Sequence, residues 1–383
     1  MTNQKSSMVH PLMQAFCLLV MSSSYICTDA DENEFVPRDL DLVIGLLRHG
    51  DRAPLGTFPT DLNPNSTYWK YGYGNLTDRG IQTMRDVGKY LRERYQGFLA
   101  DDPGETHVRS SFAYRCVMSA LLLLEELYPS KSPDEFNLAR MSEHNDKYTL
   151  YCEPQIKKQL SKLLDPFSGL LDLTWFLIRA AHELGLSLLS DANMVPEGLD
   201  AIQVQKEYGL SIPSWFEDRL DLLSYNSRRL YALIAQALIR NMGGELLRDI
   251  STLLEDRYQL AGNNTKNASA AIPGLRNATR NSKFLLFSYH DLNIMATLMV
   301  LNNTFSQRPH YGSLVFFQVT KKDQSEPDIT ILYRNGTAEP EVFPIVGCPM
   351  PCSVNKFIEV VRDQFPEAFT AESCGLPSNY TIL

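Results

Sequence analysis

Residues 40–54 read LDLVIGLLRHGDRAP, and this stretch decides the fold. Its first eight residues, Leu40 to Leu47, form an apolar run with β-branched members that stops at a polar turn, which is typical of a buried strand. Residues 48–54 follow at the carboxyl end of that strand. Because ligands bind at this edge of open α/β sheets, the sequence predicts a functional site directly after the strand.

The chain beyond this strand alternates between helical and strand patterns. Thr77 has the character of an N-cap, and the apolar spacing after it predicts an amphipathic helix over 78–95. The pattern then predicts a strand over 106–110 and a helix over 114–127. We therefore expect an α/β fold with a mixed, largely parallel sheet flanked by helices. Later strands that complete the sheet are expected at 284–288, 314–320 and 329–333.

Residues 155–265 differ from the rest, because their pattern is mostly helical. We expect a smaller helical domain here, inserted between the two parts of the α/β domain, 31–154 and 266–383. Residues 1–30 are expected to be a cleaved signal peptide. In that segment Lys5 precedes a short apolar run, and Thr28 to Ala30 offer a small-x-small cleavage site. No later segment is expected to span a membrane.

Composition narrows the class of protein. The net charge of −9 argues against a nucleic-acid binder, which usually carries a basic footprint. Asn-x-Ser/Thr acceptor sites support a secretory route, which a signal peptide also implies. These sites are Asn65, Asn75, Asn263, Asn267, Asn277, Asn302, Asn335 and Asn379.

The cysteines that remain after cleavage are five, so one should stay free. Cys348 and Cys352 flank Pro-Met-Pro and could be read as half of a metal site. No second close pair completes such a site, and an oxidising compartment favours a local disulfide instead.

The turn after the first strand has the residues of an anion pocket. Arg48, His49 and Arg52 lie within five positions, on a turn eased by Gly50. Arginine suits phosphate because its planar fork donates two hydrogen bonds at once. Flanking positive charge also lowers the pKa of His49, which keeps its imidazole neutral and able to attack phosphorus. The alternative for an isolated Arg-His pair is a basic surface turn with a hydrated histidine.

The longer pattern Arg-His-Gly-x-Arg-x-Pro resembles the signature of the histidine acid phosphatases, the family of the prostatic and lysosomal enzymes. A second signature of that family, a His-Asp pair after a late strand, is matched by His290 and Asp291. A third, an arginine after a mid-chain strand, is matched by Arg109, followed by Arg115 and a helix. The resemblance covers roughly residues 40–375 and implies a phosphoglycerate mutase-like fold.

The resemblance also implies roles for these residues. His49 resembles the nucleophile that becomes phosphohistidine, and Asp291 the general acid that protonates the leaving alcohol, which favours acidic pH. Neither a cofactor nor a metal is expected, because arginines supply the positive field. The implied substrates are small phosphate monoesters, the implied location is outside the cell or in the lysosome lumen, and a homodimer is expected. The residues that resemble the phosphate clamp are Arg48, Arg52, Arg109 and His290.

The cysteines and some wall residues complete the comparison with the family. The resemblance implies disulfides between Cys152 and Cys374 and between Cys348 and Cys352, with Cys116 left as the free, buried thiol. Phe112 and Tyr114 stand where the prostatic type has acidic residues. We interpret them as packing at the start of a helix, although they could also alter the wall of the pocket.

Two other functions remain open. One is a phosphatase of narrow specificity, of the phytase or lysophosphatidate type. The other is a secreted protein of the same fold that binds phosphate ligands without turnover. An inactive relative usually loses its nucleophile or its acid, and both His49 and Asp291 are present, which favours an enzyme.

Overall fold

The computed structural model describes residues 36–136, 138–140, 153–165, 169–187, 190–191, 194–260, 282–321 and 325–366. Several expectations lie outside these residues: the signal peptide over 1–30, the Cys152–Cys374 pair, and the acceptor sites Asn263, Asn267, Asn277 and Asn379. None of the described helices combines the length and apolar character that crossing a membrane requires.

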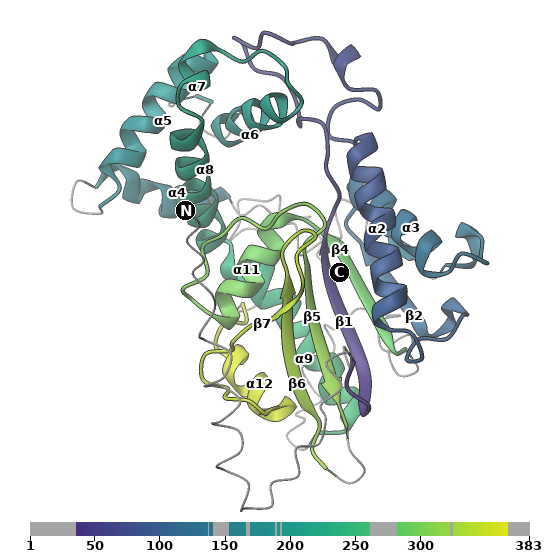
Figure 1. Ribbon diagram of the computed structural model, residues 1–383. Helices are drawn as coiled ribbons and strands as arrows, with labels where there is room; N and C mark the ends of the chain where they lie inside the picture. Colours follow the sequence, from purple (N-terminus) through teal and green to yellow (C-terminus); the bar gives the residue numbers. More distant parts are fainter. Residues whose placement is uncertain are drawn as a thin grey trace, which may run out of the picture. The chain divides into compact units, whose positions relative to one another are not determined.

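A mixed sheet organises the fold (Figure 1). Its strands lie in the order β3-β2-β4-β1-β5-β6-β7, and β8 pairs with β6. The strands on one side of β1 run parallel to it, whereas β5, β6, β7 and β8 pair antiparallel. The strands are β1 (Leu40–Arg48), β2 (Thr106–Ser110), β3 (Leu138–Arg140), β4 (Phe284–Tyr289), β5 (Leu314–Thr320), β6 (Asp328–Arg334), β7 (Glu341–Val342) and β8 (Cys352–Ser353).

The strand and helix predictions of the α/β part are confirmed almost to the residue. Strand β2 and helix α3 (Tyr114–Leu127) have the predicted bounds, and α2 (Asp78–Arg94) differs by one residue at its end. Thr77 caps α2 as expected, because its hydroxyl accepts a hydrogen bond from the backbone N–H of Gly80 at 3.0 Å. Apolar runs and caps are local signals, which explains why they could be read without a structure.

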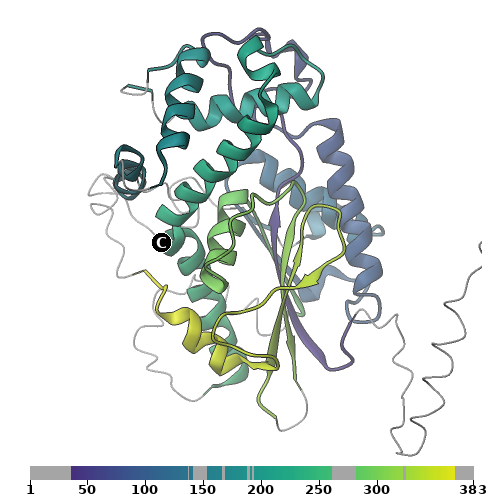
Figure 2. The ribbon, with the colours of Figure 1, turned by 60° about the vertical axis from the view of Figure 1, so that its left-hand side comes forward.

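Helices cover both faces of the sheet (Figure 2). On one side lie α2 and α3, which pack against each other. On the other side, α9 (Glu245–Tyr258), α11 (Asp291–Leu301) and α12 (Val354–Arg362) bury their apolar sides against the even-numbered residues of β1. Leu42, Ile44 and Leu46 belong to this core, and all three are fully buried. The strand is therefore buried on both faces, as its continuous apolar run predicts.

A second hydrophobic core lies in the helical region between β3 and α9. The helices at the top of Figure 1 form it around Leu173, Leu199, Phe216 and Leu223. Ala296 of α11 joins this core, so α11 contacts both cores. The helices of this region are α4 (Glu153–Leu160), α5 (Leu171–Leu184), α6 (Met194–Glu207), α7 (Ser214–Glu217) and α8 (Leu220–Ala237).

A π-helical segment, Ile239–Gly244, joins α8 to α9 and packs closely against α11. A side chain at Gly243 would bring its Cβ to 2.5 Å from the carbonyl oxygen of Ala296. A Cβ at Gly244 would lie 2.0 Å from the carbonyl oxygen of Gln364. Only glycine permits these approaches, so Gly243 allows α11 to lie close to the π-helical segment and Gly244 allows the chain after α12 to do so.

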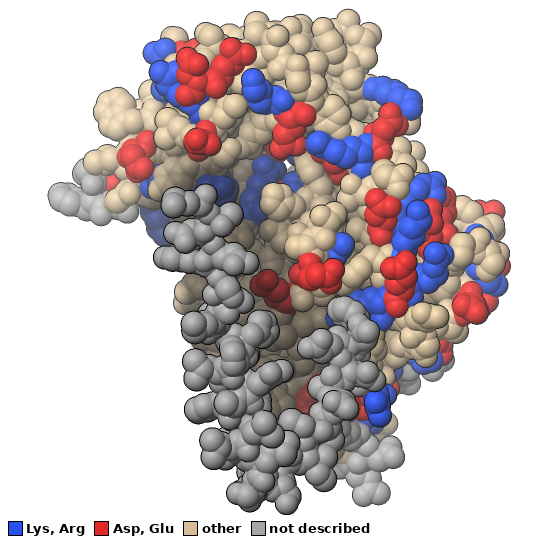
Figure 3. Space-filling model, in the orientation of Figure 1, with Lys and Arg blue, Asp and Glu red and all other residues tan. Residues whose placement is uncertain are grey.

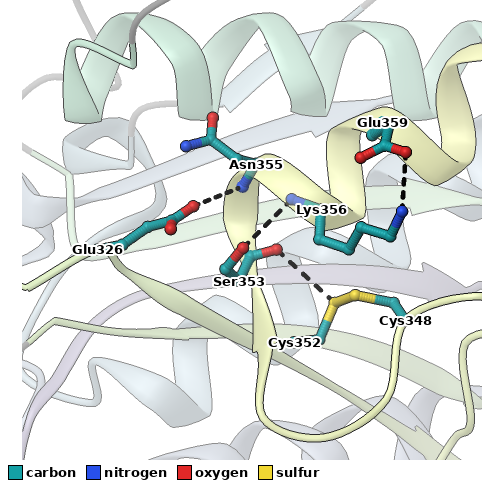
Figure 4. The surroundings of a disulfide bond; sticks show 7 residues. All are labelled: Glu326, Cys348, Cys352, Ser353, Asn355, Lys356 and Glu359. Atoms are coloured by element: carbon teal, nitrogen blue, oxygen red, sulfur yellow. Dashed lines mark hydrogen bonds and ion pairs between the residues drawn. A yellow bond between two sulfur atoms is a disulfide. The ribbon is translucent and has the colours of Figure 1, made fainter.

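A disulfide joins Cys348 and Cys352 in the described part of the chain (Figure 4). Ser353 follows it and caps α12, since its hydroxyl accepts from the backbone N–H of Lys356 at 3.3 Å. The disulfide thus closes the loop over 348–352, and the helix cap follows directly after it. Cys116 is a buried thiol that forms no disulfide within the described residues, as expected.

Candidate active site

The carboxyl ends of β1 and β4 bring the two motif histidines together. The strands run side by side and parallel, with Arg48 opposite Tyr289. The residues that follow, His49 and His290, therefore emerge at the same edge, and their ring centroids lie 5.5 Å apart. This adjacency follows from the sheet topology, which no local pattern specifies.

Two glycines let the chain turn at this edge. The turn after β1 crosses the first turn of α2 so closely that a Cβ on Gly50 would lie 2.6 Å from the carbonyl oxygen of Gly80. A Cβ on Gly80 would lie 2.0 Å from the carbonyl oxygen of Asp51. The backbone N–H of Gly50 also donates to the hydroxyl of Ser119 at 3.0 Å. The conformation of the motif therefore depends on contacts with α2 and α3.

The hydrogen bonds of His49 identify its tautomer. Its Nε2 lies 3.2 Å from Nε of Arg115, which can only donate, so Nε2 must carry the lone pair. The proton is then on Nδ1, which donates to the carbonyl oxygen of Gly50 at 2.8 Å. Burial lowers the pKa of His49 well below its usual range, and the positive charges of Arg115 and the motif arginines lower it further. His49 is thus a neutral imidazole whose lone pair faces a guanidinium.

His290 is neutral for the same reasons. Nη2 of Arg115 lies 3.3 Å from its Nδ1, so the proton is on Nε2, which lies 3.1 Å from the hydroxyl of Ser111. Burial, followed by the charge of Arg115, lowers the pKa of His290 to about 3. One guanidinium therefore contacts both histidines and orders both tautomers.

Asp291 begins α11 and is ionised. Its Oδ2 pairs with Nη2 of Arg48 at 3.0 Å and with Nε of Arg308 at 2.7 Å, and its Oδ1 accepts from the backbone N–H of Leu292 at 2.9 Å. Burial alone raises the pKa of this carboxyl, but Arg48 and Arg308 outweigh burial and hold the pKa well below its usual range. Both oxygens of Asp291 are therefore occupied.

Asp200 links the helical region to this edge. It lies on α6, is buried, and pairs with Nη2 of Arg52 at 2.9 Å and with Nη2 of Arg308 at 2.8 Å. Burial raises its pKa, but the two arginines lower it below the ordinary aspartate value. The carboxylate of Asp200 on α6 thus holds Arg52 and Arg308 of the α/β part in place.

Asp51, the acidic residue between the motif arginines, is a structural partner. Its carboxylate accepts from the hydroxyls of Thr77 and Tyr208, each at 2.5 Å, and from Arg79 at 2.9 Å. It thereby links the turn after β1 to α2 and to the end of α6.

Part of this cluster, including Arg48, Asp200 and Arg308, lines an open cleft of about 770 Å³ between the sheet edge and the helical region. The edge contributes Arg48 and Tyr311, and the facing helices contribute Asp200 and Arg228. Figure 3 shows lysine and arginine atoms recessed in a hollow beneath the helical region. Arg48 also stacks on the Tyr311 ring, with Cζ 4.0 Å from the centroid, and donates to the carbonyl oxygen of Pro309.

The structure brings His49, His290, Asp291, Arg48 and Arg52 to one site, but it also shows residues that the sequence did not single out. Arg109 is fully buried within β2, and the guanidinium that reaches His49 belongs to Arg115. Arg115 lies in the first turn of α3, directly after the carboxyl end of β2, so the strand-end rule that located His49 could have found it. Nothing in the local sequence indicates Asp200 or Arg308.

Of the described glycosylation acceptors, Asn65 is exposed, whereas Asn75, Asn302 and Asn335 are partly buried. Oδ1 of Asn335 accepts from the backbone N–H of His310 and from the hydroxyls of Ser313 and Tyr333. Asn335 also lines the cleft, which sets it apart from Asn65.

The arrangement can bind a tetrahedral dianion and attack it. Four guanidinium groups, those of Arg48, Arg52, Arg115 and Arg308, meet two carboxylates, those of Asp200 and Asp291. This leaves an excess of positive charge around a neutral imidazole with an available lone pair. Among the described residues, no group of three His, Cys, Asp or Glu side chains is arranged to hold a metal ion.

Comparison with known proteins agrees with this chemistry. The sequence model of the histidine phosphatase superfamily (branch 2) matches residues 39–333. The testicular acid phosphatase of Mus musculus is 27% identical over 362 residues, covering 86% of this chain and 81% of the relative. The lysosomal acid phosphatase of Xenopus laevis is 28% identical over 351 residues, covering 85% of this chain and 76% of the relative.

The fold is also found among solved structures. The phytase of Citrobacter braakii superimposes with a TM-score of 0.61 at 16% identity, covering 88% of this chain and 99% of the phytase. At this identity the likeness concerns the fold, an α/β body with a helical region beside the carboxyl edge of its sheet.

Proposed function

This chain belongs to branch 2 of the histidine phosphatase superfamily, and from that premise we propose that it is an acid phosphatase that hydrolyses small phosphate monoesters through His49. The testicular and lysosomal relatives are acid phosphatases, and this chain matches 81% and 76% of their respective lengths. One observation carries the proposal: the lone pair of His49 Nε2 faces the guanidinium of Arg115, at the edge where Arg48 and Asp291 also meet.

The first step is the transfer of the phosphoryl group to His49. Phosphoryl transfer needs an in-line nucleophile and positive charge on the non-bridging oxygens. Arg115 now donates to the lone pair that must attack, so the phosphate has to enter between them and take over the N–H groups of Arg115. Arg48, Arg52, Arg109 and His290 are the further phosphate contacts in this proposal.

The leaving alcohol needs a proton, because an alkoxide is a poor leaving group. We assign the donor role to Asp291, which pairs with Arg48. Its pairing with two arginines favours the ionised form, so protonation requires acidic solution or the loss of one arginine contact. The same carboxylate then accepts a proton from the water that hydrolyses the phosphohistidine.

The surroundings of the site suggest how substrates are chosen. In this proposal the helices α4 to α8 of the predicted insertion over 155–265 form a cap, because α6 and α8 line the cleft opposite the sheet edge, whereas α9 packs against the sheet. The signal-like segment over 1–30, the glycosylation acceptors and the lysosomal relatives favour secretion or delivery to the lysosome lumen. Assembly into a homodimer is part of the proposal as well.

The decisive experiment replaces the nucleophile. His49→Ala is expected to abolish hydrolysis of an aryl phosphate at acidic pH while leaving phosphate binding measurable. Asp291→Asn should retain phosphoenzyme formation only with good leaving groups, because these need no proton. Unchanged turnover in His49→Ala would refute the assignment. Phosphate binding without turnover in the unaltered chain would favour the alternative of a binding protein.

A further inference from the structure

Arg308 holds an unusual position beside the proposed general acid. It lies in the loop between α11 and β5, and its Nε contacts Oδ2 of Asp291 at 2.7 Å. Its Nη2 contacts Oδ1 of Asp200 at 2.8 Å, and its Cζ lies 3.8 Å from the ring centroid of Tyr231. One side chain therefore spans the sheet edge and two helices of the facing region.

The contacts of Asp291 conflict with its role as a proton donor. Its Oδ2 already pairs with two arginines, and a protonated carboxyl cannot keep both ion pairs. One arginine must therefore release it before the proton is transferred. Arg48 is the more firmly held of the two, because its side chain is 5% exposed, stacks on Tyr311 and donates to the backbone of Pro309. The side chain of Arg308, which lines the cleft as Arg48 does, is 15% exposed and belongs to a loop.

Charge balance indicates what could draw Arg308 away. Four guanidinium groups face two carboxylates in the site, an excess of two positive charges that a phosphate dianion neutralises. Protonation of Asp291 adds one more positive charge to the balance. That charge falls on Arg308, whose remaining partner, Asp200, is shared with Arg52.

We propose that Arg308 is a specificity-determining residue that selects phosphate monoesters whose leaving alcohol carries a second anionic group, a carboxylate or a phosphate, next to the scissile oxygen. This inference rests on the proposed function and deepens it. The second anion accepts the Nε–H of Arg308 and releases Asp291. The N–P bond to His49 then forms as the P–O bond to the alcohol breaks, and the proton of Asp291 passes to the departing oxygen.

The groups around Asp291 define the pH dependence that goes with this selection. Arg48 and His49 face it from the end of β1, Arg115 from α3, Asp200 from α6, Tyr231 from α8, and His290 and Arg308 from the adjoining segments. Arg48 and Arg308 both pair with Asp291 and line the cleft, and Arg308 is the more exposed of the two. Its loss should therefore shift the pH profile toward higher pH, because Asp291 then protonates more readily.

The test compares matched substrates with the full chain. Phosphoglycolate and its neutral amide differ in one carboxylate, and 1,2-ethanediol bisphosphate and 2-hydroxyethyl phosphate differ in one phosphate. We expect kcat/KM to be about 10- to 100-fold higher for at least one anionic member than for its neutral partner, the range of a charged hydrogen bond. The pair with the larger ratio identifies the preferred group. Equal values within both pairs would overturn the inference.

Variants locate the effect. Arg308→Gln should reduce the ratio of kcat/KM for the anionic substrate to that for the neutral one to near one, chiefly through kcat, and should move the alkaline limb of the pH profile to higher pH. Arg308→Lys, which keeps the charge but not the fork, should give an intermediate ratio. Arg228→Gln is the matched control, since Arg228 lines the same cleft from α8 but has no described contact with Asp291. Arg228→Gln should retain most of the ratio of kcat/KM between the anionic substrate and its neutral partner.

The outcomes separate this inference from the proposed function. An unchanged ratio in Arg308→Gln, or an equal loss with both substrates, would show that Arg308 only supports the structure and would overturn the inference. The phosphatase assignment would survive both results, because it depends on His49→Ala. Thermal unfolding of each variant confirms that the comparison is made between folded proteins.

Discussion

The sheet edge and the helical region contribute to the same cleft in different ways. The edge supplies a nucleophile candidate, an acid candidate and three arginines from residues that directly follow β1, β2 and β4 or open the next helix. The helical region supplies Asp200, Tyr208 and Tyr231, each of which contacts an edge residue and none of which could carry the transfer. The edge is thus equipped for chemistry, and the helical region positions it.

The largest expected effect tests whether the edge depends on Arg115. Arg115→Gln removes the guanidinium that contacts both histidines and should lower kcat/KM about 10²- to 10³-fold, as loss of a preorganised donor does. Arg109→Gln, assayed beside it on an aryl phosphate, should have the smaller effect on turnover per folded molecule. A larger loss at Arg109 would restore that residue as the main clamp.

Acid stability distinguishes the two regions next. The folded pKa of His290 is about 3, below the 6.5 of an unfolded chain, so between these values the unfolded state binds a proton that the folded state does not. Stability should therefore fall as pH falls through this window, by about 1.4 kcal/mol per pH unit for this one group. His290→Asn should show a shallower slope in denaturant unfolding between pH 7 and 4.

The control for this prediction lies on the helical region. The side chain of His182 on α5 is 78% exposed, and His182→Asn should leave the slope unchanged. A shallower slope in His182→Asn, or the same slope in His290→Asn, would mean that the acid sensitivity does not originate at the sheet edge.

The smallest expected effect concerns the hydrogen bond from Tyr208 to Asp51, which links the helical region to the sheet edge. Tyr208→Phe removes the hydroxyl that donates to Asp51 and should cost about 1 kcal/mol of unfolding free energy, with little change in kcat. Tyr225→Phe, whose side chain is 49% exposed on α8, is the matched control in the same denaturant titration. A large fall in kcat for Tyr208→Phe would show that the helical region also takes part in the chemistry.

The contrast also explains what the sequence could predict. Strand β1, helix α2 with its Thr77 cap and the motif residues were predictable, because apolar runs, caps and short motifs are local. The family signatures identified His49, His290 and Asp291, whose adjacency then followed from parallel strands. Asp200 and Arg308 were not predictable, because their meeting depends on how α6 packs above the sheet edge.

Arg115 lies between these cases. It stands in the sequence at the predicted helix start, whereas the family resemblance pointed to Arg109, which precedes the same turn and stays a proposed phosphate contact. Arg109 is fully buried within β2, and Arg115 contacts both histidines from α3. Side-chain direction at a strand end is a tertiary property that spacing does not encode.

The hydrogen bond between Nδ1 of His49 and the carbonyl oxygen of Gly50 has a regiochemical consequence. Since that proton occupies the nitrogen nearer the backbone, the remote nitrogen is the one that would be phosphorylated, giving the tele isomer of phosphohistidine. A phosphoramidate of this kind is destroyed by acid and survives in alkali. Any search for the trapped enzyme should therefore quench with base, and an acid quench would erase the species it was meant to capture.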